Sequence, residues 1–133
     1  MSLPSPSIAE ILSNSLFDWI TIDLEHSTIN INQAEELIRI VDLSKKTALV
    51  RLTDNDSNQI KRVMDAGAHG IIVPMINNEK ELLKAIHSTR YYPDGERGVG
   101  LARAQKYGKN FKSYFKWQKK QPIVIAQIEN KKA

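Results

Sequence analysis

The sequence has no cysteine, which excludes disulfide bonds and thiolate chemistry. It also has no apolar run of about eighteen residues, the length that a membrane-spanning helix needs. Its first residues lack the basic start and apolar stretch of a signal peptide. We therefore expect a cytoplasmic protein with no membrane partner, whose metal ligands would be carboxylates and histidines.

Acidic residues are missing from one segment, although the net charge of the whole chain is only +4. Between Arg103 and Lys120 there are seven basic residues and no acidic one, and aromatic residues are interleaved with them. This composition is typical of surfaces that stack on single-stranded nucleic acid. Four of the aromatic residues, however, have the i, i+4, i+7, i+8 spacing of a helix face that packs on a sheet, so no nucleic-acid partner is expected. These four are Tyr107, Phe111, Tyr114 and Phe115.

The rest of the composition is that of a soluble globular domain. The 133 residues are 41% hydrophobic and 26% charged, and no linker or low-complexity segment divides them. We expect one domain over residues 1–133.

Short apolar runs alternate with amphipathic segments along the chain. This alternation predicts right-handed βαβ units, and so an α/β fold with a parallel sheet and helices outside it. Four strands are half of a closed (β/α)8 TIM barrel, so the chain is expected to be part of such a barrel, with open edges that favour a homo-oligomer. The expected helices are 7–15, 30–45, 57–66 and 78–88, with a further lysine-rich helix after residue 103, and the expected strands are 17–24, 47–52, 70–73 and 123–128.

Two carboxylates and an imidazole follow the first of these strands. Asp23 and Glu25 share one face if the strand continues, and the carboxyl ends of parallel strands are where ligands bind. An Asp-x-x-His step suits a general base, because Asp23 can hold the imidazole of His26 in one tautomer. The alternative is a strand that ends in ordinary polar loop residues.

Charged groups also end two other strands. Arg51 must be paired or face a ligand, so it either binds a carboxylate or keto acid oxygen or forms an internal salt bridge to Asp23 or Glu129. Gln127 and Glu129 emerge on one face, where Glu129 suits a hard divalent cation, and a simple surface glutamate is the alternative.

Three further features give weaker signals. Arg97 belongs to a short glycine-rich loop that could hold a phosphate or a distal carboxylate of a substrate, and we leave it outside the core site. His69 and His87 are expected to be ordinary structural residues.

Five motifs occur in the order and approximate spacing of one family. They are Asp23-Leu24-Glu25-His26, Val50-Arg51, the run 65–74, Arg97-Gly98-Val99-Gly100 and Gln127-Ile128-Glu129. On these motifs the sequence resembles the HpcH/HpaI aldolases, which are metal-dependent class II pyruvate aldolases. The resemblance implies a (β/α)8 barrel, of which this chain covers roughly strands two to five.

The resemblance also implies roles for single residues. His26, oriented by Asp23, would be the base, and Arg51 would contact the pyruvate enolate oxygen, with Gln127 beside the substrate. Glu129 would be one of two protein ligands of a Mg²⁺, Mn²⁺ or Co²⁺ ion, whose partner aspartate lies on the next strand. Ser27 departs from the glycine that is usual in the family.

The implied reaction is cleavage of a 4-hydroxy-2-keto acid to pyruvate and an aldehyde. Two alternatives remain open: an acyl-CoA lyase of the citrate-lyase-like branch, and a non-catalytic barrel fragment that acts as an assembly unit. The isolated 133-residue chain is expected to be inactive, since it lacks the second metal ligand.

Overall fold

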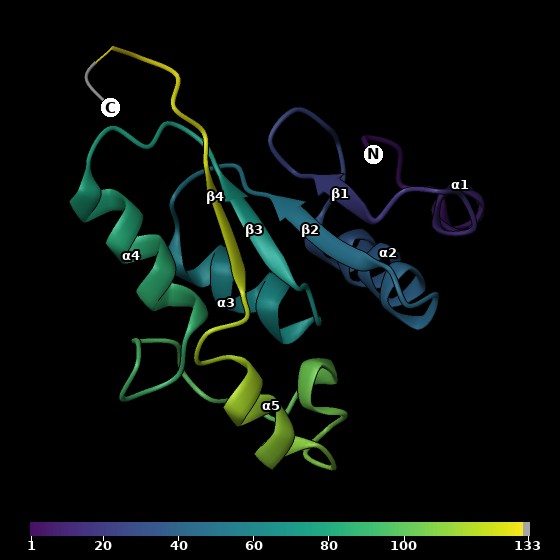
Figure 1. Ribbon diagram of the computed structural model, residues 1–133. Helices are drawn as coiled ribbons and strands as arrows, with labels where there is room; N and C mark the ends of the chain where they lie inside the picture. The colour runs from purple at the N-terminus through teal and green to yellow at the C-terminus, as the bar shows by residue number, and fades with distance from the viewer. Residues whose placement is uncertain (132–133) are drawn as a thin grey trace.

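The computed structural model describes residues 1–131, and its centre is one parallel sheet (Figure 1). The strands lie side by side in sequence order, β1-β2-β3-β4, with every neighbouring pair parallel. This order confirms the expected architecture. The bounds are β1 Trp19–Asp23, β2 Thr47–Arg51, β3 Gly70–Val73 and β4 Ile123–Ala126.

The helices α2, α3 and α4 lie together on one side of the sheet, and α1 packs beside α2 (Figure 1). The short elements η1 and α5 lie near the amino ends of β3 and β4, opposite the arrowheads. The bounds are α1 Pro6–Ser13, α2 Ile31–Leu43, α3 Ser57–Asp65, α4 Glu79–Thr89, η1 Arg103–Gln105 and α5 Phe111–Trp117.

Side-chain caps fix where the three sheet-covering helices begin. Asn30 accepts hydrogen bonds from two backbone N–H groups of α2 and forms a capping box with Gln33. Asp56 accepts from two backbone N–H groups at the start of α3, and Asn78 accepts from the backbone N–H of Glu81 in α4. Gly67 follows α3 at φ +101, the left-handed conformation that glycine adopts without strain.

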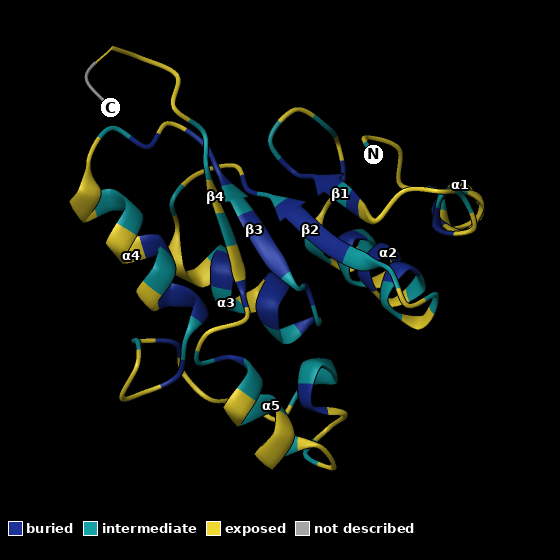
Figure 2. Cartoon of the chain, viewed as in Figure 1, coloured by how far each residue is buried: buried dark blue, intermediate teal, exposed yellow. Residues whose placement is uncertain are grey.

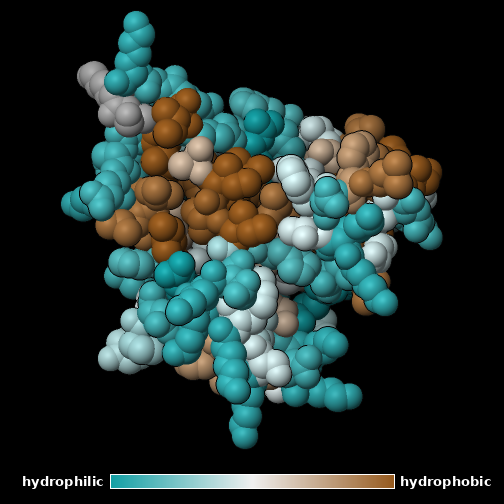
Figure 3. All heavy atoms as spheres, in the orientation of Figure 1, coloured by the Kyte–Doolittle hydropathy of each residue, from teal (hydrophilic) through white to brown (hydrophobic). Residues whose placement is uncertain are grey.

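The core lies between the sheet and these helices, and the opposite face of the sheet is open. In Figure 2, β2 and β3 are mostly buried, whereas β4 is partly exposed. The strand register places Trp19, Leu49 and Ile125 on the open face, where Trp19 is 58% and Ile125 40% exposed. Figure 3 shows an apolar patch over this face. The four strands thus have the arrangement of half a barrel whose interior is uncovered.

The sequence prediction differs from the structure most clearly after residue 100. The expected helical stripe from Tyr107 to Phe115 is wrong, because the α-helix begins only at Phe111 and Tyr107 is 69% exposed. Lys106 and Tyr107 both have positive φ angles, 52° and 53°, which ends the turn of η1. Elsewhere the element ends agree to within one or two residues.

No helix in the described part of the chain is long and apolar enough to cross a membrane.

Candidate active site

The expected polar groups lie at the carboxyl ends of the strands, on the open face. The register pairs Asp23 with Arg51, Arg51 with Ile72 and Ile72 with Ile125, so these four residues form one layer across the sheet. Gln127 comes two residues after Ile125. The layer therefore has a charged half on β1 and β2 and an apolar half on β3 and β4.

Asp23 and Arg51 form a bidentate ion pair. Arg51 Nε donates to Asp23 Oδ1 at 2.9 Å, and Nη2 donates to Oδ2 at 2.6 Å. Backbone N–H groups of Glu25 and His26 also donate to Oδ1, at 3.0 and 3.2 Å. These donors, with Arg51 the largest cause, hold the pKa of Asp23 far below its usual range despite its burial. Asp23 is therefore a fixed anion and does not act as a base near neutral pH.

Arg51 is both paired and accessible. The internal salt bridge to Asp23, one of the two alternatives from the sequence, is present. The hydrogen bond to Asp23 raises the pKa of Arg51. Its side chain is still 29% exposed, and the paired atoms Nε and Nη2 leave Nη1 outside the pair. A guanidinium held in this way can donate to a ligand above the open face.

Glu25 completes this group, and it is the residue that the sequence reasoning did not place in the site. Its Oε2 lies 3.4 Å from Arg51 Nε, and its Oε1 lies 3.6 Å from His26 Nε2. Oε2 is buried and makes no hydrogen bond. The alternation of a strand continued past Asp23, noted in the sequence, was the signal that could have identified it.

The expected contact between Asp23 and the imidazole of His26 is absent. The Asp23 carboxylate accepts from the backbone N–H of His26, and the ring lies beside Glu25 instead. The physical reason is that Arg51 occupies both oxygens of Asp23. The His26 side chain is 72% exposed, so the ring is open to a ligand from solvent.

Gln127 and Glu129 contact each other, as expected for residues on one face. Gln127 Nε2 donates to Glu129 Oε1 at 3.2 Å. The other oxygen, Oε2, accepts from the backbone N–H of Met75 at 2.8 Å. Met75 follows β3 and has a φ of 54°. The ends of β3 and β4 are thus joined through the carboxylate that is expected to bind a metal.

The described residues supply only part of a metal site. Within residues 1–131 no group of three or more histidine, aspartate or glutamate side chains is placed to hold one ion. Glu129 is exposed and its carboxylate is the donor type that Mg²⁺ and Mn²⁺ prefer, so it fits as one ligand. Asp23 is occupied by Arg51 and does not fit as another.

Arg97 is not a substrate residue in this structure, which corrects the weaker expectation. Its side chain is fully buried near the amino ends of the strands, where it pairs with Asp65 at 2.7 Å. It also donates to the Thr89 carbonyl and to the hydroxyls of Tyr91 and Tyr114. A buried guanidinium needs such partners, and no local sequence pattern identifies which residues they are.

Comparison with known protein families identifies the family of this chain. The HpcH/HpaI aldolase/citrate lyase family matches residues 1–133. The chain belongs to this family. The assignment agrees with the resemblance found in the five sequence motifs.

Two similar family members carry enzyme names. The chain is 36% identical over 130 residues to the 4-hydroxy-2-oxovalerate aldolase of Novosphingobium aromaticivorans, covering 97% of this chain and 49% of that protein. It is 36% identical over 135 residues to the 4-hydroxy-2-oxo-heptane-1,7-dioate aldolase of Shigella flexneri, covering 100% and 50%. The chain spans about half the length of these relatives.

A solved structure supports the fold. A HpcH/HpaI aldolase/citrate lyase family protein from Burkholderia cenocepacia J2315 matches with a TM-score of 0.90 and 30% identity. The match covers 99% of this chain and 54% of that one. The half-barrel seen here is therefore the arrangement that the same segment has in a longer family member.

Proposed function

We propose that this chain is the part of a metal-dependent pyruvate aldolase that binds and cleaves 4-hydroxy-2-keto acids. Residues 1–133 would belong to a single β/α-barrel domain. The observation that carries the proposal is the Arg51 guanidinium, fixed by Asp23 at the carboxyl end of the sheet and open to a ligand. The names of the similar family members favour an aldolase over an acyl-CoA lyase.

Arg51 stabilises the charge that develops during cleavage. When the bond between C3 and C4 of the substrate breaks, its electron pair moves toward the C2 carbonyl, whose oxygen becomes an enolate. A guanidinium already oriented by two hydrogen bonds to Asp23 meets this charge without reorganising. Asp23 is thus a positioning residue for Arg51. C3 then takes up one proton from solvent, which balances the proton lost by the C4 hydroxyl and yields pyruvate.

His26 accepts the proton of the C4 hydroxyl, so that the C4 fragment leaves as an aldehyde. Its side chain is 72% exposed, and its Nε2 lies 3.6 Å from Glu25 Oε1. Glu25 also approaches Arg51, so one carboxylate links the base to the guanidinium.

Glu129 is the metal ligand that this chain contributes, and Gln127 orients it through their hydrogen bond. A Mg²⁺, Mn²⁺ or Co²⁺ ion held there would supply positive charge that stabilises the developing enolate. The Glu129 carboxylate, which accepts from the Met75 N–H, would hold the cation.

The test uses the full-length protein and measures pyruvate release from 4-hydroxy-2-keto acids. Activity is expected with a divalent metal and is lost on adding a chelator. Arg51→Ala lowers kcat/KM by a factor of 100 or more, about 3 kcal/mol of transition-state stabilisation. Arg39→Ala, which removes an exposed pair on α2, is the control. Full activity of Arg51→Ala would remove this residue from the mechanism.

A second set of variants separates the two roles of Glu25. Glu25→Gln is expected to lower kcat/KM about tenfold in the parent protein, a loss of about 1.4 kcal/mol. If Glu25 acts through His26, the same change has little further effect once His26→Ala is present. If Glu25→Gln still lowers kcat/KM tenfold in the His26→Ala protein, Glu25 acts through Arg51 instead.

A further inference from the structure

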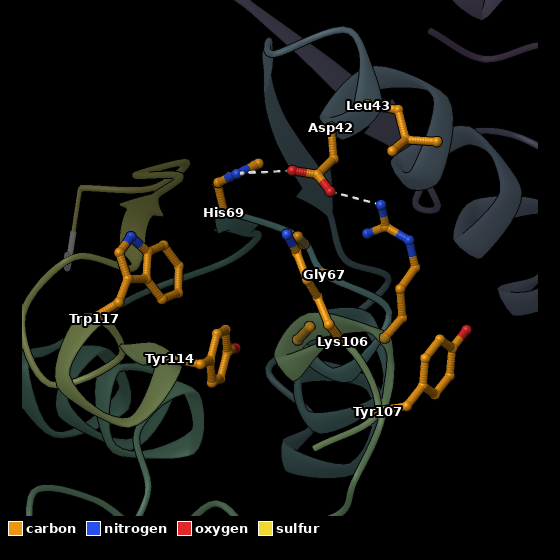
Figure 4. A pocket seen from close by; sticks show the side chains of 11 residues that line it. Asp42, Leu43, Gly67, His69, Lys106, Tyr107, Tyr114 and Trp117 are labelled. Atoms are coloured by element: carbon orange, nitrogen blue, oxygen red, sulfur yellow. Dashed lines mark hydrogen bonds and ion pairs between the residues drawn. The ribbon is translucent and has the colours of Figure 1, made fainter. Parts of the chain in front are cut away.

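A cavity of about 390 Å³ is shown in Figure 4. It is lined by residues that precede β3, at the opposite end of the sheet from the proposed catalytic groups. Its walls come from the end of α2, the turn before β3, and the segment from η1 to α5. The four residues of β3 separate the turn at His69 from the catalytic end, a distance of about 13 Å along the strand. The volume is in the range of small-molecule sites, about 300–1,000 Å³.

One wall is a chain of charged and polar groups built from distant parts of the sequence. Arg103 Nη2 pairs with Asp42 Oδ2 at 2.6 Å, and Nη1 donates to the Ala66 carbonyl at 3.1 Å. Asp42 Oδ1 lies 3.5 Å from His69 Nε2 (Figure 4). This wall therefore contains the Arg103–Asp42 ion pair, whose two charges cancel.

The imidazole of His69 has a fixed orientation in this wall. Its Nδ1 accepts a hydrogen bond from the backbone N–H of Ala48 at 3.1 Å, which requires the hydrogen to be on Nε2. Burial lowers the pKa of His69, with Asp42 opposing the effect, so the neutral ring is favoured. His69 therefore adds a polar N–H and no net charge.

The other wall is aromatic. Trp117 and Tyr114 stack with their ring centroids 5.3 Å apart, and Trp117 meets the His69 ring edge-on at 6.2 Å. Tyr107 stands at the rim and is largely exposed. Tyr107, Tyr114 and Trp117 belong to the aromatic and basic segment 103–120, which has no role in the proposed catalytic function.

Lys106 supplies the uncompensated charge. It lines the cavity, and within residues 1–131 no ion pair is formed by its ammonium group. Figure 4 shows its side chain extending toward the end where Asp42 and His69 lie. Lys106 and Tyr107 both have a left-handed backbone, and both line the cavity. With Asp42 and Arg103 cancelling, the lining carries a net charge of about +1.

We propose that this cavity binds a small aromatic carboxylate, with the ring against Tyr114 and Trp117 and the carboxylate toward Lys106. Apolar and aromatic walls with a few placed polar groups are typical of such sites. The single net cation favours one negative charge on the ligand, and a guest ring can contact the exposed surfaces of aromatic side chains. This site is independent of the proposed aldolase chemistry.

The test is a calorimetric or ligand-observed NMR titration of the full-length protein with 1-naphthoate. We expect saturable binding that weakens about fivefold for the neutral analogue 1-naphthalenemethanol, the scale of a partly exposed charge contact. Lys106→Asn is expected to weaken 1-naphthoate binding to a similar extent, since asparagine tolerates the left-handed backbone. Lys109→Asn, on the same segment outside the cavity, is the matched control and leaves binding unchanged.

Three results would overturn the proposal. One is the absence of saturable binding up to about 10 mM ligand, far above the concentration expected for a built site. Another is equal binding by the parent protein and Lys106→Asn. The third is displacement of 1-naphthoate by pyruvate, which would place the ligand at the catalytic end. None of these depends on whether the protein has aldolase activity.

Discussion

Single residues in this chain differ greatly in how their charges are held. The carboxylate of Asp23 is buried and accepts five hydrogen bonds, two from Arg51, two from the backbone and one from the Ser2 hydroxyl. The imidazole of His26, three residues later, is mostly exposed. This division agrees with the proposal that Asp23 positions Arg51 and that His26 accepts a proton.

The Asp23–Arg51 pair makes the free energy of unfolding depend on pH in the acid range. Since the folded-state pKa of Asp23 is lowered, its stabilisation is complete above the ordinary value near 3.9 and is lost as pH falls toward the folded value. We expect the free energy of unfolding of the parent protein, relative to Asp23→Asn, to fall by about 2 kcal/mol between pH 5 and pH 2. Urea unfolding at both pH values measures this. A difference that does not change with pH would contradict it.

At the scale of elements, the segment between α4 and β4 is fixed by a buried polar network. Arg97 pairs with Asp65 of α3 and lies 4.5 Å above the Tyr91 ring. Gln118 Oε1 accepts from the backbone N–H of Tyr91, and Gln105 donates to the Tyr91 hydroxyl. Through these contacts η1 and α5, which are too short to be stable alone, are attached to the helices that cover the sheet.

Removing the guanidinium of this network should be costly. Arg97→Ala leaves the partly buried Asp65 carboxylate and the Tyr114 hydroxyl without the guanidinium that donates to them, so we expect a loss of about 3–5 kcal/mol in the free energy of unfolding. Arg39→Ala is the matched control, because it removes an exposed i, i+4 pair with Glu35 and should cost less than about 1 kcal/mol. Chemical denaturation of both variants tests this. Similar losses of unfolding free energy in Arg97→Ala and Arg39→Ala would show that burial of the ion pair does not determine the cost.

At the scale of the whole molecule, the feature that matters most is the uncovered face of the sheet. Four parallel strands have helices on one side only, and apolar side chains such as Ile123 and Ile125 are 42% and 40% exposed on the other. Parallel sheets are normally covered on both faces. In the longer family members with which this chain aligns, further chain accounts for about half of the protein.

A polypeptide limited to these 133 residues should therefore self-associate. Sedimentation is expected to show dimers or larger species, because contiguous apolar patches above a few hundred Å² are rare on soluble monomers. Ile125→Ser, on the open face, should shift the distribution toward monomer. Leu83→Ser, an exposed leucine on α4, is the control and should not. A monomeric parent polypeptide would contradict the prediction.

The sequence by itself determined the alternation of strands and helices, because hydrophobic period and capping residues such as Asn30 and Asn78 act locally. It also determined which end of the sheet carries the charged groups, since each follows its own strand. Only the tertiary structure decided how these groups pair: Arg51 binds Asp23, and His26 lies beside Glu25. It also decided the buried network around Arg97 and the cavity at the amino ends of the strands. Contacts between residues far apart in the chain depend on packing and desolvation, which have no local pattern.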